Sequence, residues 1–310
     1  MPILARMQDS FARFFDGDIW YSFKQSKITV VAAIVTVVLI LSAVFAPLLS
    51  LQNPFDPAAL DLMDAFNPPV WGEDGSWRFP IGTDDQGRDL YSAILYGSRL
   101  SLLIGFASVV FAMALGVTLG LIAGYLGGTV DAVIMRIADV QISFPGILIA
   151  LLIDGVARAL LPGGQHDEMV VYVLILAIGL SQWVNFARTV RGSTMVERNK
   201  EYVQAARVIG VSRPRIMVRH ILRNVMGPVL VIATITLAVA ILSEATLSFL
   251  GVGVPPTQPS LGTLIRIGQD FLFSGEWWIV IFPGAMLAIL VLAVNLLGDW
   301  LRDVFDPKLR

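Results

Sequence analysis

Residues 201–224, EYVQAARVIGVSRPRIMVRHILRN, decide how the rest of the chain is interpreted. The stretch holds five arginines, a pair of alanines, a glycine and a proline, and it lies between two long apolar runs. Insertion of such a segment into lipid is unfavourable, because each charged side chain at the centre of a membrane helix costs about 2.5 to 3.5 kcal/mol of insertion free energy. We therefore expect the stretch to lie outside the lipid and to be bound by another molecule.

The composition is that of a membrane protein. Of the 310 residues, 56% are hydrophobic and 15% are charged, and the mean hydropathy is +0.74, which is far from an ordinary soluble domain. A net charge of −2 gives no basis for nucleic-acid binding. The chain has no cysteine, so disulfides, thiolate nucleophiles and cysteine metal sites are excluded, and His166 and His220 are its only imidazoles.

A bilayer core about 30 Å thick needs roughly 20 mostly apolar residues in helical form. Five charge-free runs meet this requirement, namely 28–49, 100–130, 170–187, 225–243 and 277–298. A sixth run, 140–153, is short, has Asp139 and Asp154 at its ends, and holds Pro145 and Gly146 in its middle. We predict that it spans too, because neighbouring helices can satisfy the backbone groups that proline and glycine free. The predicted fold is an all-α membrane protein with six transmembrane helices.

Lysine and arginine are retained on the cytoplasmic side of short loops. With the N-terminus inside, 17 of the 22 Lys and Arg residues fall in cytoplasmic segments. Both termini are then cytoplasmic. The predicted organisation is a cytoplasmic segment 1–27, a transmembrane helix 28–49, an extracytoplasmic loop 50–98, a five-helix core 99–301 that contains the cytoplasmic segment 188–224, and a cytoplasmic tail 302–310.

The extracytoplasmic loop ends in a cluster of turn-forming residues. Gly82, Asp84, Asp85 and Gly87 predict a capped turn. A calcium loop is the weaker alternative, because the terminal glutamate of the 12-residue pattern is missing. The next stretch, RDLYSAILYGSR at residues 88–99, predicts a short helix that lies on the membrane surface.

Within the opening stretch, residues 200–209 predict a short helix with a small apolar face. Tyr202, Ala205, Ala206 and Ile209 recur at i, i+3, i+4 and i+7 and share that face. Alanines on an exposed face let another backbone come close, which suits a helix laid into the groove of a partner. A basic loop that binds anionic lipid headgroups is the alternative; it explains the arginines but not the small face.

The predicted helix is followed by a sharp break. Gly210 is a good helix-ending residue, and Ser212 with Pro214 marks the start of a second, basic helix that leads back to the membrane.

These residues resemble the cytoplasmic EAA loop of bacterial ABC importer permeases, whose pattern is E-A-A, three residues, G, nine residues, I-x-L-P. Ala205, Ala206, Gly210 and Leu222 match the pattern, whereas Gln204, His220 and Arg223 replace its Glu, Ile and Pro. Four other stretches add to the resemblance: GTDDQGRD at 82–89, SEATLSFLGVG at 243–253, WWIVIFPG at 277–284 and GDWLRDVFDPKLR at 298–310. Together they resemble the second permease subunit of dipeptide, oligopeptide and nickel importers, from about residue 20 to residue 310.

The resemblance implies the ABC type I importer permease fold, similar to that of the methionine importer, and a multi-pass location in the bacterial inner membrane. It implies as partners a homologous second permease subunit, two ABC ATPase subunits, an extracytoplasmic peptide-binding protein and membrane lipid. ATP and Mg are expected on the ATPase subunits and no cofactor on this chain, which has no G-x-x-x-x-G-K-[ST] phosphate loop. The implied ATPase-docking residues are Glu201, Tyr202, Gln204, Ala205, Ala206, Arg207, Ile209 and Gly210.

The predicted function is that of a permease subunit that forms half of the pore of an ATP-driven importer of di- or oligopeptides. An importer of nickel or another small solute is the alternative, and a secondary transporter that relies on membrane carboxylates such as Asp139, Asp154 and Glu244 is a further one. Glu244 and Asp139 are the pore or gate candidates, although for Glu244 a structural role, in which it reaches interfacial water or bonds to a neighbouring helix, is the slightly favoured alternative. An enzyme is disfavoured, because the chain has no H-E-x-x-H or G-x-S-x-G motif and no metal-ligand set.

Overall fold

The computed structural model describes residues 18–56, 58, 60–161 and 165–305. In this part of the chain the only β pairing is an isolated bridge between Thr83 and Asp89. The helices are α2 (Asp18–Gln25), α3 (Lys27–Val44), α4 (Ala46–Leu49), η2 (Leu62–Asp64), α5 (Leu90–Leu126), α6 (Gly128–Ile142), α7 (Gly146–Leu160), α8 (Gln165–Glu197), α9 (Glu201–Val208), α10 (Arg213–Arg215), η3 (Ile216–Ile221), α11 (Leu222–Phe249), α12 (Leu261–Phe271), η4 (Leu272–Ser274) and α13 (Trp278–Phe305).

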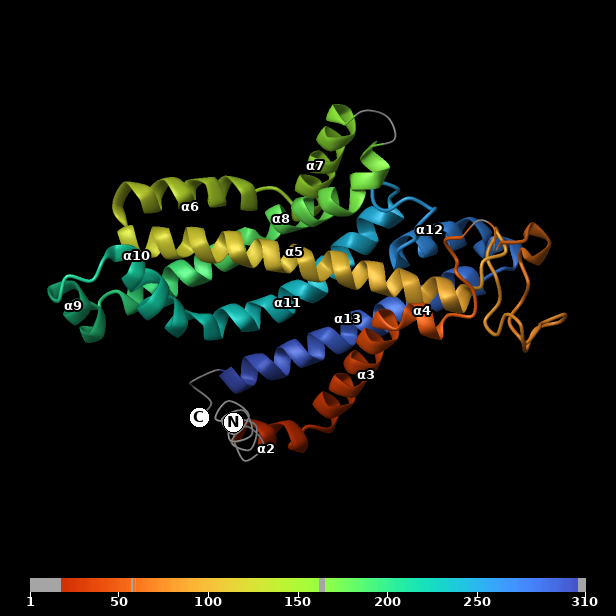
Figure 1. Cartoon of the computed structure of the whole chain (residues 1–310), viewed down its shortest axis with the longest axis horizontal. Helices are drawn as coiled ribbons and strands as arrows, with labels where there is room; N and C mark the ends of the chain where they lie inside the picture. The colour runs from red at the N-terminus through yellow and green to blue at the C-terminus, as the bar shows by residue number, and fades with distance from the viewer. Residues whose placement is uncertain (1–17, 57, 59, 162–164, 306–310) are drawn as a thin grey trace, which may run out of the picture.

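Five helical segments are long and apolar enough to cross a membrane, and they confirm the five apolar runs of the sequence. They are α3, α5, most of α8, the run from α10 to the end of α11, and most of α13. Helices suit this setting because lipid offers no partner for free backbone N–H and C=O groups. Figure 1 shows an elongated bundle with α2, α9 and the last turns of α13 toward one end and the long loop before α5 at the other.

The third predicted span is broken rather than straight. Helices α6 and α7 meet at 93° across the Pro145 turn, and together they make the sixth candidate span. Proline lacks an N–H group and disfavours the helical conformation of the preceding residue, which explains the break. Helix α6 also begins earlier than predicted, because Gly127 and Gly128 have φ of +68° and +56° and reverse the chain directly after α5. Arg136 therefore lies on a helix.

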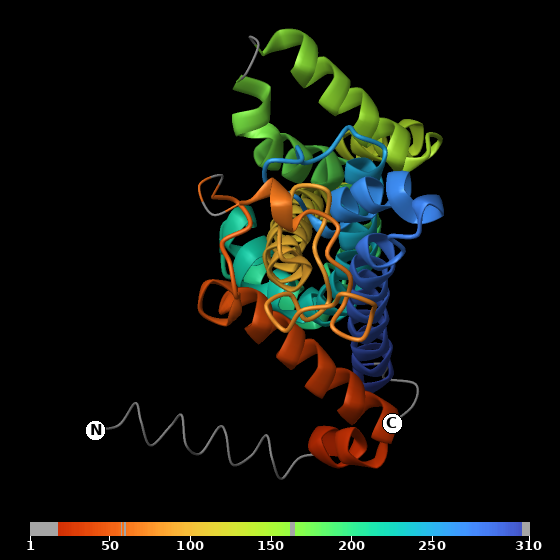
Figure 2. The ribbon, with the colours of Figure 1, turned by 90° about the vertical axis from the view of Figure 1, so that its right-hand side faces the viewer.

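Helix α5 is the central helix of the bundle, and Figure 2 views it nearly end-on with α3 at the periphery. Its closest approach is to α8, along Gly116, Gly120 and Gly124, which are spaced one helical turn apart. A Cβ atom added at any of the three glycines would lie 2.4 to 2.7 Å from a carbonyl oxygen of α8. Small residues at this spacing let two membrane helices pack backbone to backbone.

The predicted surface helix at residues 88–99 is wrong, because α5 already begins at Leu90. Asp89 caps it by accepting hydrogen bonds at 2.9 Å from the Ser92 N–H and at 2.5 Å from the Ser92 hydroxyl. No break separates these first turns from the apolar part of α5. The end of the predicted loop 50–98 is therefore the outer end of a spanning helix.

The predicted capped turn before α5 is confirmed. Gly82 and Gly87 have φ of +89° and +73°, and the buried Asp84 carboxylate accepts a backbone hydrogen bond from Arg88 at 3.0 Å and pairs with its Nε at 2.5 Å. Arg88 also donates to the Pro256 carbonyl at 2.8 Å, in the loop before α12. Through this bond the turn is attached to the loop that leads into α12. The sequence did not predict α12, because its eleven residues are too few to span a membrane.

Replacement of Gly120 by leucine should separate α5 from α8. A side chain at this position has no room next to the α8 backbone, and overpacking typically costs about 1 to 3 kcal/mol. We expect a lower thermal midpoint for the purified protein in detergent. Gly155→Leu on α7 is the matched control, because nothing lies within 4 Å of a Cβ added there. Equal losses for the two variants would contradict the close approach.

Asp85 should make stability depend on pH. Burial, and after it the charge of Asp84, raise the pKa of the Asp85 carboxyl above its ordinary value of 3.8. The folded state therefore favours the neutral form, and this contribution to stability is lost as pH rises from about 3.8 through the folded pKa. Asp85→Asn is neutral throughout, so we expect a higher thermal midpoint than the parent at pH 7.5 and a smaller difference at pH 4.

The exposed Asp74 provides the control for this experiment. Asp74→Asn should leave the midpoint of thermal unfolding unchanged at both pH values. A lower midpoint for Asp85→Asn at pH 7.5 would show that the Asp85 charge stabilises the turn.

Candidate functional site

The cytoplasmic segment predicted from the sequence forms a protruding helix at one end of the bundle (Figure 1). Helix α8 ends at Glu197, and α9 follows after a short turn and covers Glu201–Val208. The predicted helix 200–209 is confirmed to within one residue at each end. Gly210 has φ of +85°, the left-handed conformation that favours glycine after a helix end.

The predicted face of α9 is wrong in detail, because its four residues divide between two sides. Ala206 is buried together with Val203, which is three residues earlier and was not predicted. Ala205 and Ile209 are exposed, and Tyr202 is half-buried. Val203 and Ala206, an i, i+3 pair, pack against the rest of the chain. The sequence pattern shows only that a helix face is apolar, and not whether that face contacts the chain itself or a partner.

A different set of residues forms the free surface of α9. Ala205, Val208 and Ile209 recur at i, i+3 and i+4, and the exposed fractions of Val208 and Ile209 are 88% and 80%. Neighbouring apolar side chains that are this exposed form a candidate contact surface. Sequence analysis missed Val208, whose hydrophobicity was a usable signal. The exposed triad of Ala205, Val208 and Ile209 is here called the α9 tip.

The remaining predicted docking residues surround the α9 tip. Glu201 is exposed. The Gln204 side-chain amide donates to the Asn199 carbonyl at 3.0 Å. The Arg207 guanidinium lies over the Tyr125 ring at 5.1 Å from its centroid, which ties the end of α9 to the end of α5 by a cation–π contact.

One carboxylate connects α9 to two spanning helices. Glu197, the last residue of α8, pairs with Lys200 Nζ at 2.5 Å and accepts the Tyr202 hydroxyl at 2.5 Å. Asn224, near the start of α11, donates from its amide to the Tyr202 hydroxyl at 2.9 Å and to Glu197 at 3.3 Å. Burial, and then the neighbouring carboxylate, raise the pKa of Tyr202, so its hydroxyl stays protonated and can donate. We call these four residues the Glu197 cluster.

The predicted second helix returns from the α9 tip to the membrane. Gly210 and Val211 donate backbone hydrogen bonds to the Arg207 and Ala206 carbonyls, both at 3.0 Å, and so close the end of α9. Ser212 then precedes α10, and η3 is a stretch of π-helix that continues into α11. A π-helical stretch is rare, occurs mostly as a single turn within a longer helix, and is frequent at functional sites.

With this geometry in place, comparison with known proteins assigns the family. The family of binding-protein-dependent transport system inner membrane components matches residues 116–310. This chain belongs to that family. Its first part, residues 10–69, matches the N-terminal transmembrane domain of oligopeptide transport permease C.

Relatives of this inner-membrane component cover nearly the whole chain. It is 36% identical to the dipeptide transport system permease protein DppC of Haemophilus influenzae, over 94% of this chain and 95% of the relative. It is 37% identical to the oligopeptide transport system permease protein OppC of Bacillus subtilis, over 94% and 90%. An inward-facing structure of the MetNI methionine ABC transporter has a similar fold, with a TM-score of 0.53 at 17% identity, over 69% of this chain and 96% of that one.

Glu244, one of the two pore or gate candidates, lies inside this inner-membrane component. The side chain is fully buried within the chain. Its carboxylate accepts hydrogen bonds from Ser101 on α5 at 2.6 Å and from Ser248 on α11 at 2.8 Å. Leu261 N–H, at the start of α12, reaches the Ser101 oxygen at 3.4 Å. These contacts support the structural alternative, in which Glu244 joins three helices.

The other two predicted carboxylates are paired. Asp139, on α6, accepts a hydrogen bond from Arg188 of α8 at 2.6 Å, and both side chains are about half exposed. The buried Asp154 pairs with Arg158 at 2.8 Å, one turn further along α7. Arg158 also donates to the Val252 carbonyl at 3.2 Å. Asp139 thus lies on an exposed surface, where it connects α6 to α8, and Asp154 lies buried within the bundle.

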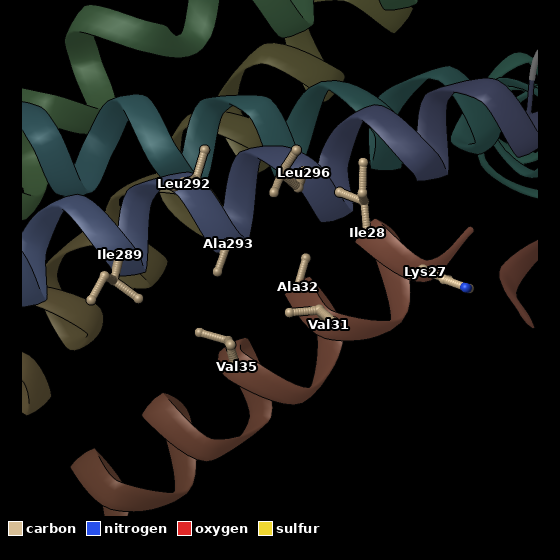
Figure 3. Close-up of a pocket in the computed structure, with 9 residues that line it drawn as sticks. All are labelled: Lys27, Ile28, Val31, Ala32, Val35, Ile289, Leu292, Ala293 and Leu296. Carbon is tan, nitrogen blue, oxygen red and sulfur yellow. The ribbon is translucent and has the colours of Figure 1, made fainter.

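An apolar groove of about 340 Å³ separates α3 from α13 (Figure 3). Its lining is aliphatic except for Lys27 at one end, as the labelled side chains show. A surface of this kind matches lipid tails, because it has almost no group that orients a polar solute. We therefore do not place a solute-binding site there.

Loss of the Tyr202 hydroxyl should loosen α9. A hydrogen bond to a charged group contributes about 1.5 to 3 kcal/mol, so Tyr202→Phe should lower the protection of residues 201–208 in amide hydrogen exchange by about tenfold or more. Tyr172→Phe is the control, since Tyr172 on α8 is 65% exposed. Equal protection of α9 in Tyr202→Phe and the parent would show that the Glu197 cluster does not hold the helix.

Proposed function

We propose that this inner-membrane component is a permease subunit of an ATP-driven importer of di- or oligopeptides. The names of its relatives, dipeptide and oligopeptide permease proteins that match over nearly the whole chain, support the substrate class. In this proposal the chain forms half of the pore with a homologous second permease. Two ATPase subunits bind ATP and Mg on the cytoplasmic side, and an extracytoplasmic binding protein delivers the peptide. This chain contributes no catalytic residue and binds no cofactor.

The exposed α9 tip is the observation that carries the coupling part of the proposal. An apolar contact surface at the end of a short helix suits a groove on a partner, because such a helix docks with its apolar side chains inserted. We infer that the ATPase subunits provide this groove. The lipid-binding loop is a poorer explanation, since it leaves the exposed aliphatic side chains of Val208 and Ile209 without a role.

The attachment of α9 makes it suitable for transmitting movement. Val203 and Ala206 pack inside the chain, and the Glu197 cluster connects α9 to the ends of α8 and α11. When the ATPases close on nucleotide, displacement of α9 would therefore shift both spanning helices together. Packed helices move between a few discrete arrangements and do not deform continuously. In this proposal, the shift of α8 and α11 therefore switches the pore from access on one side of the membrane to access on the other.

Enlargement of Ala205 tests the docking surface. Ala205→Trp places a large side chain in a close-packed contact, at a cost of about 1 to 3 kcal/mol, so ATPase association should weaken by about one to two orders of magnitude. Co-purification of the ATPases and peptide-stimulated ATP hydrolysis of the reconstituted complex measure this effect. Normal association, hydrolysis and import in this variant would show that the α9 tip does not contact the ATPases.

The exposed Ala58, in the loop before α5, provides the matched control. Ala58→Trp adds the same side chain on a different part of the chain and should leave ATPase association unchanged. Loss of association in both variants would indicate a general folding defect.

A further inference from the structure

A hollow of about 380 Å³ lies between α8 and α11, and its lining includes side chains of Gln182, Asn185, Arg188 and Thr189 on α8 and Thr236 on α11. Gln182 and Thr236 are close to the middle of their helices, which cover Gln165–Glu197 and Leu222–Phe249. The volume falls in the range of about 300 to 1,000 Å³ that is usual for ligand sites. The hollow is thus a ligand-sized space half-way along two spanning helices.

The polar residues of α8 form one stripe. Gln182, Asn185 and Thr189 recur at i, i+3 and i+7 and share a face, while Phe186 and Val190 are fully buried and pack within the hydrophobic core. The span that contains the stripe is the least apolar of the five. Polar side chains that face lipid are costly, so a stripe of this kind indicates a face directed at water or at another protein.

The side-chain amides of Asn185 and Gln182 are hydrogen-bonded to each other, and each keeps one further hydrogen-bonding atom without a partner among the described residues. Asn185 Nδ2 donates to Gln182 Oε1 at 3.1 Å. Among the described residues, Asn185 Oδ1 and Gln182 Nε2 have no hydrogen-bond partner. One free acceptor and one free donor side by side match a peptide group, which offers one N–H and one C=O. Such a pair accepts any peptide, because every residue except proline carries both groups.

A charged pair lies at the edge of the hollow. Arg188 donates from Nη2 to Asp139 Oδ1 at 2.6 Å, and the exposed fractions of the two side chains are 45% and 54%. A guanidinium has five N–H donors, so Arg188 keeps donors for a carboxylate such as the C-terminus of a peptide. Asp139 holds Arg188 in place and offsets its charge.

We propose that Gln182, Asn185, Arg188 and Thr189 line the translocation path and hydrogen-bond the main chain of the passing peptide. This inference rests on the proposed function as a peptide importer. It assigns the polar face of α8 to the substrate and makes the Asp139–Arg188 pair part of the wall of the path. A polar contact between this face and the second permease is the competing arrangement, and the experiment below separates the two.

Water access to the stripe tests the path. The chain has no cysteine, so Asn185→Cys and Thr189→Cys each introduce its only thiol. The complete importer in proteoliposomes is treated with a charged methanethiosulfonate reagent during ATP turnover, and modification of this chain is followed by mass spectrometry. Thr118→Cys is the control, because Thr118 on α5 is exposed on the surface of the bundle and its hydroxyl bonds only to its own helix.

We expect the two stripe variants to react at least about tenfold faster than Thr118→Cys, since the reactive thiolate forms only where water reaches it. Modification of either stripe variant should also stop peptide import. Reaction as slow as that of the control, in a complex that imports peptides, would overturn this inference and favour a contact with the second permease. If the unsubstituted complex imports no peptide, the proposed function itself fails.

A second comparison tests the hydrogen bonds. Asn185→Leu removes both the free acceptor and the partner of Gln182, and the loss of one or two hydrogen bonds should reduce maximal peptide import by about five- to tenfold. ATP hydrolysis should stay within about twofold of the parent, so fewer peptides enter per ATP. Equal losses of import and hydrolysis would indicate a merely structural residue and contradict the inference. The conservative variant Asn185→Gln should restore import.

Discussion

The bundle depends on the close approach of α5 and α8. Gly116, Gly120 and Gly124 give α5 a surface without side chains, and the α8 backbone lies directly against it. Lipid provides little hydrophobic force between helices, so contact of this kind supplies much of the packing energy through van der Waals interactions. With one face of α8 occupied in this way, its polar stripe is directed away from α5 and toward the hollow beside α11.

Polar groups in the membrane region fall into two sets that differ in burial. The Glu244 carboxylate and its serine partners are enclosed and join α5, α11 and the start of α12. Enclosed groups of this kind must be hydrogen-bonded, because an unpaired polar atom inside a protein costs about 1 to 3 kcal/mol. Gln182, Asn185 and Arg188 are open on one side and keep unused donors or acceptors. Under the proposal above, the passing solute contacts the second set.

The two ends of the bundle are built differently. At the outer end, the Asp84–Arg88 pair and the Glu244 bonds hold the loops and α12 against α5. At the inner end, α9 projects from the bundle and is attached through the Glu197 cluster and two small buried side chains. Under the proposed function, force applied to α9 reaches α8 and α11, and these are the helices that border the hollow. Coupling and substrate path would then use the same pair of helices.

The membrane class, five of the spans, the α9 helix and the Gly210 break were all predicted correctly from local features of the sequence. This was possible because apolar run length, helical periodicity and turn residues are local properties. Three features emerge only from the packing of the helices: which face of α9 is free, the enclosure of Glu244, and the 93° bend between α6 and α7. The sequence also did not single out the polar residues around Asn185. The run 170–187 contains no charged residue, so it was interpreted only as a transmembrane helix. These features depend on which residues from distant helices meet, and a single sequence does not record those contacts.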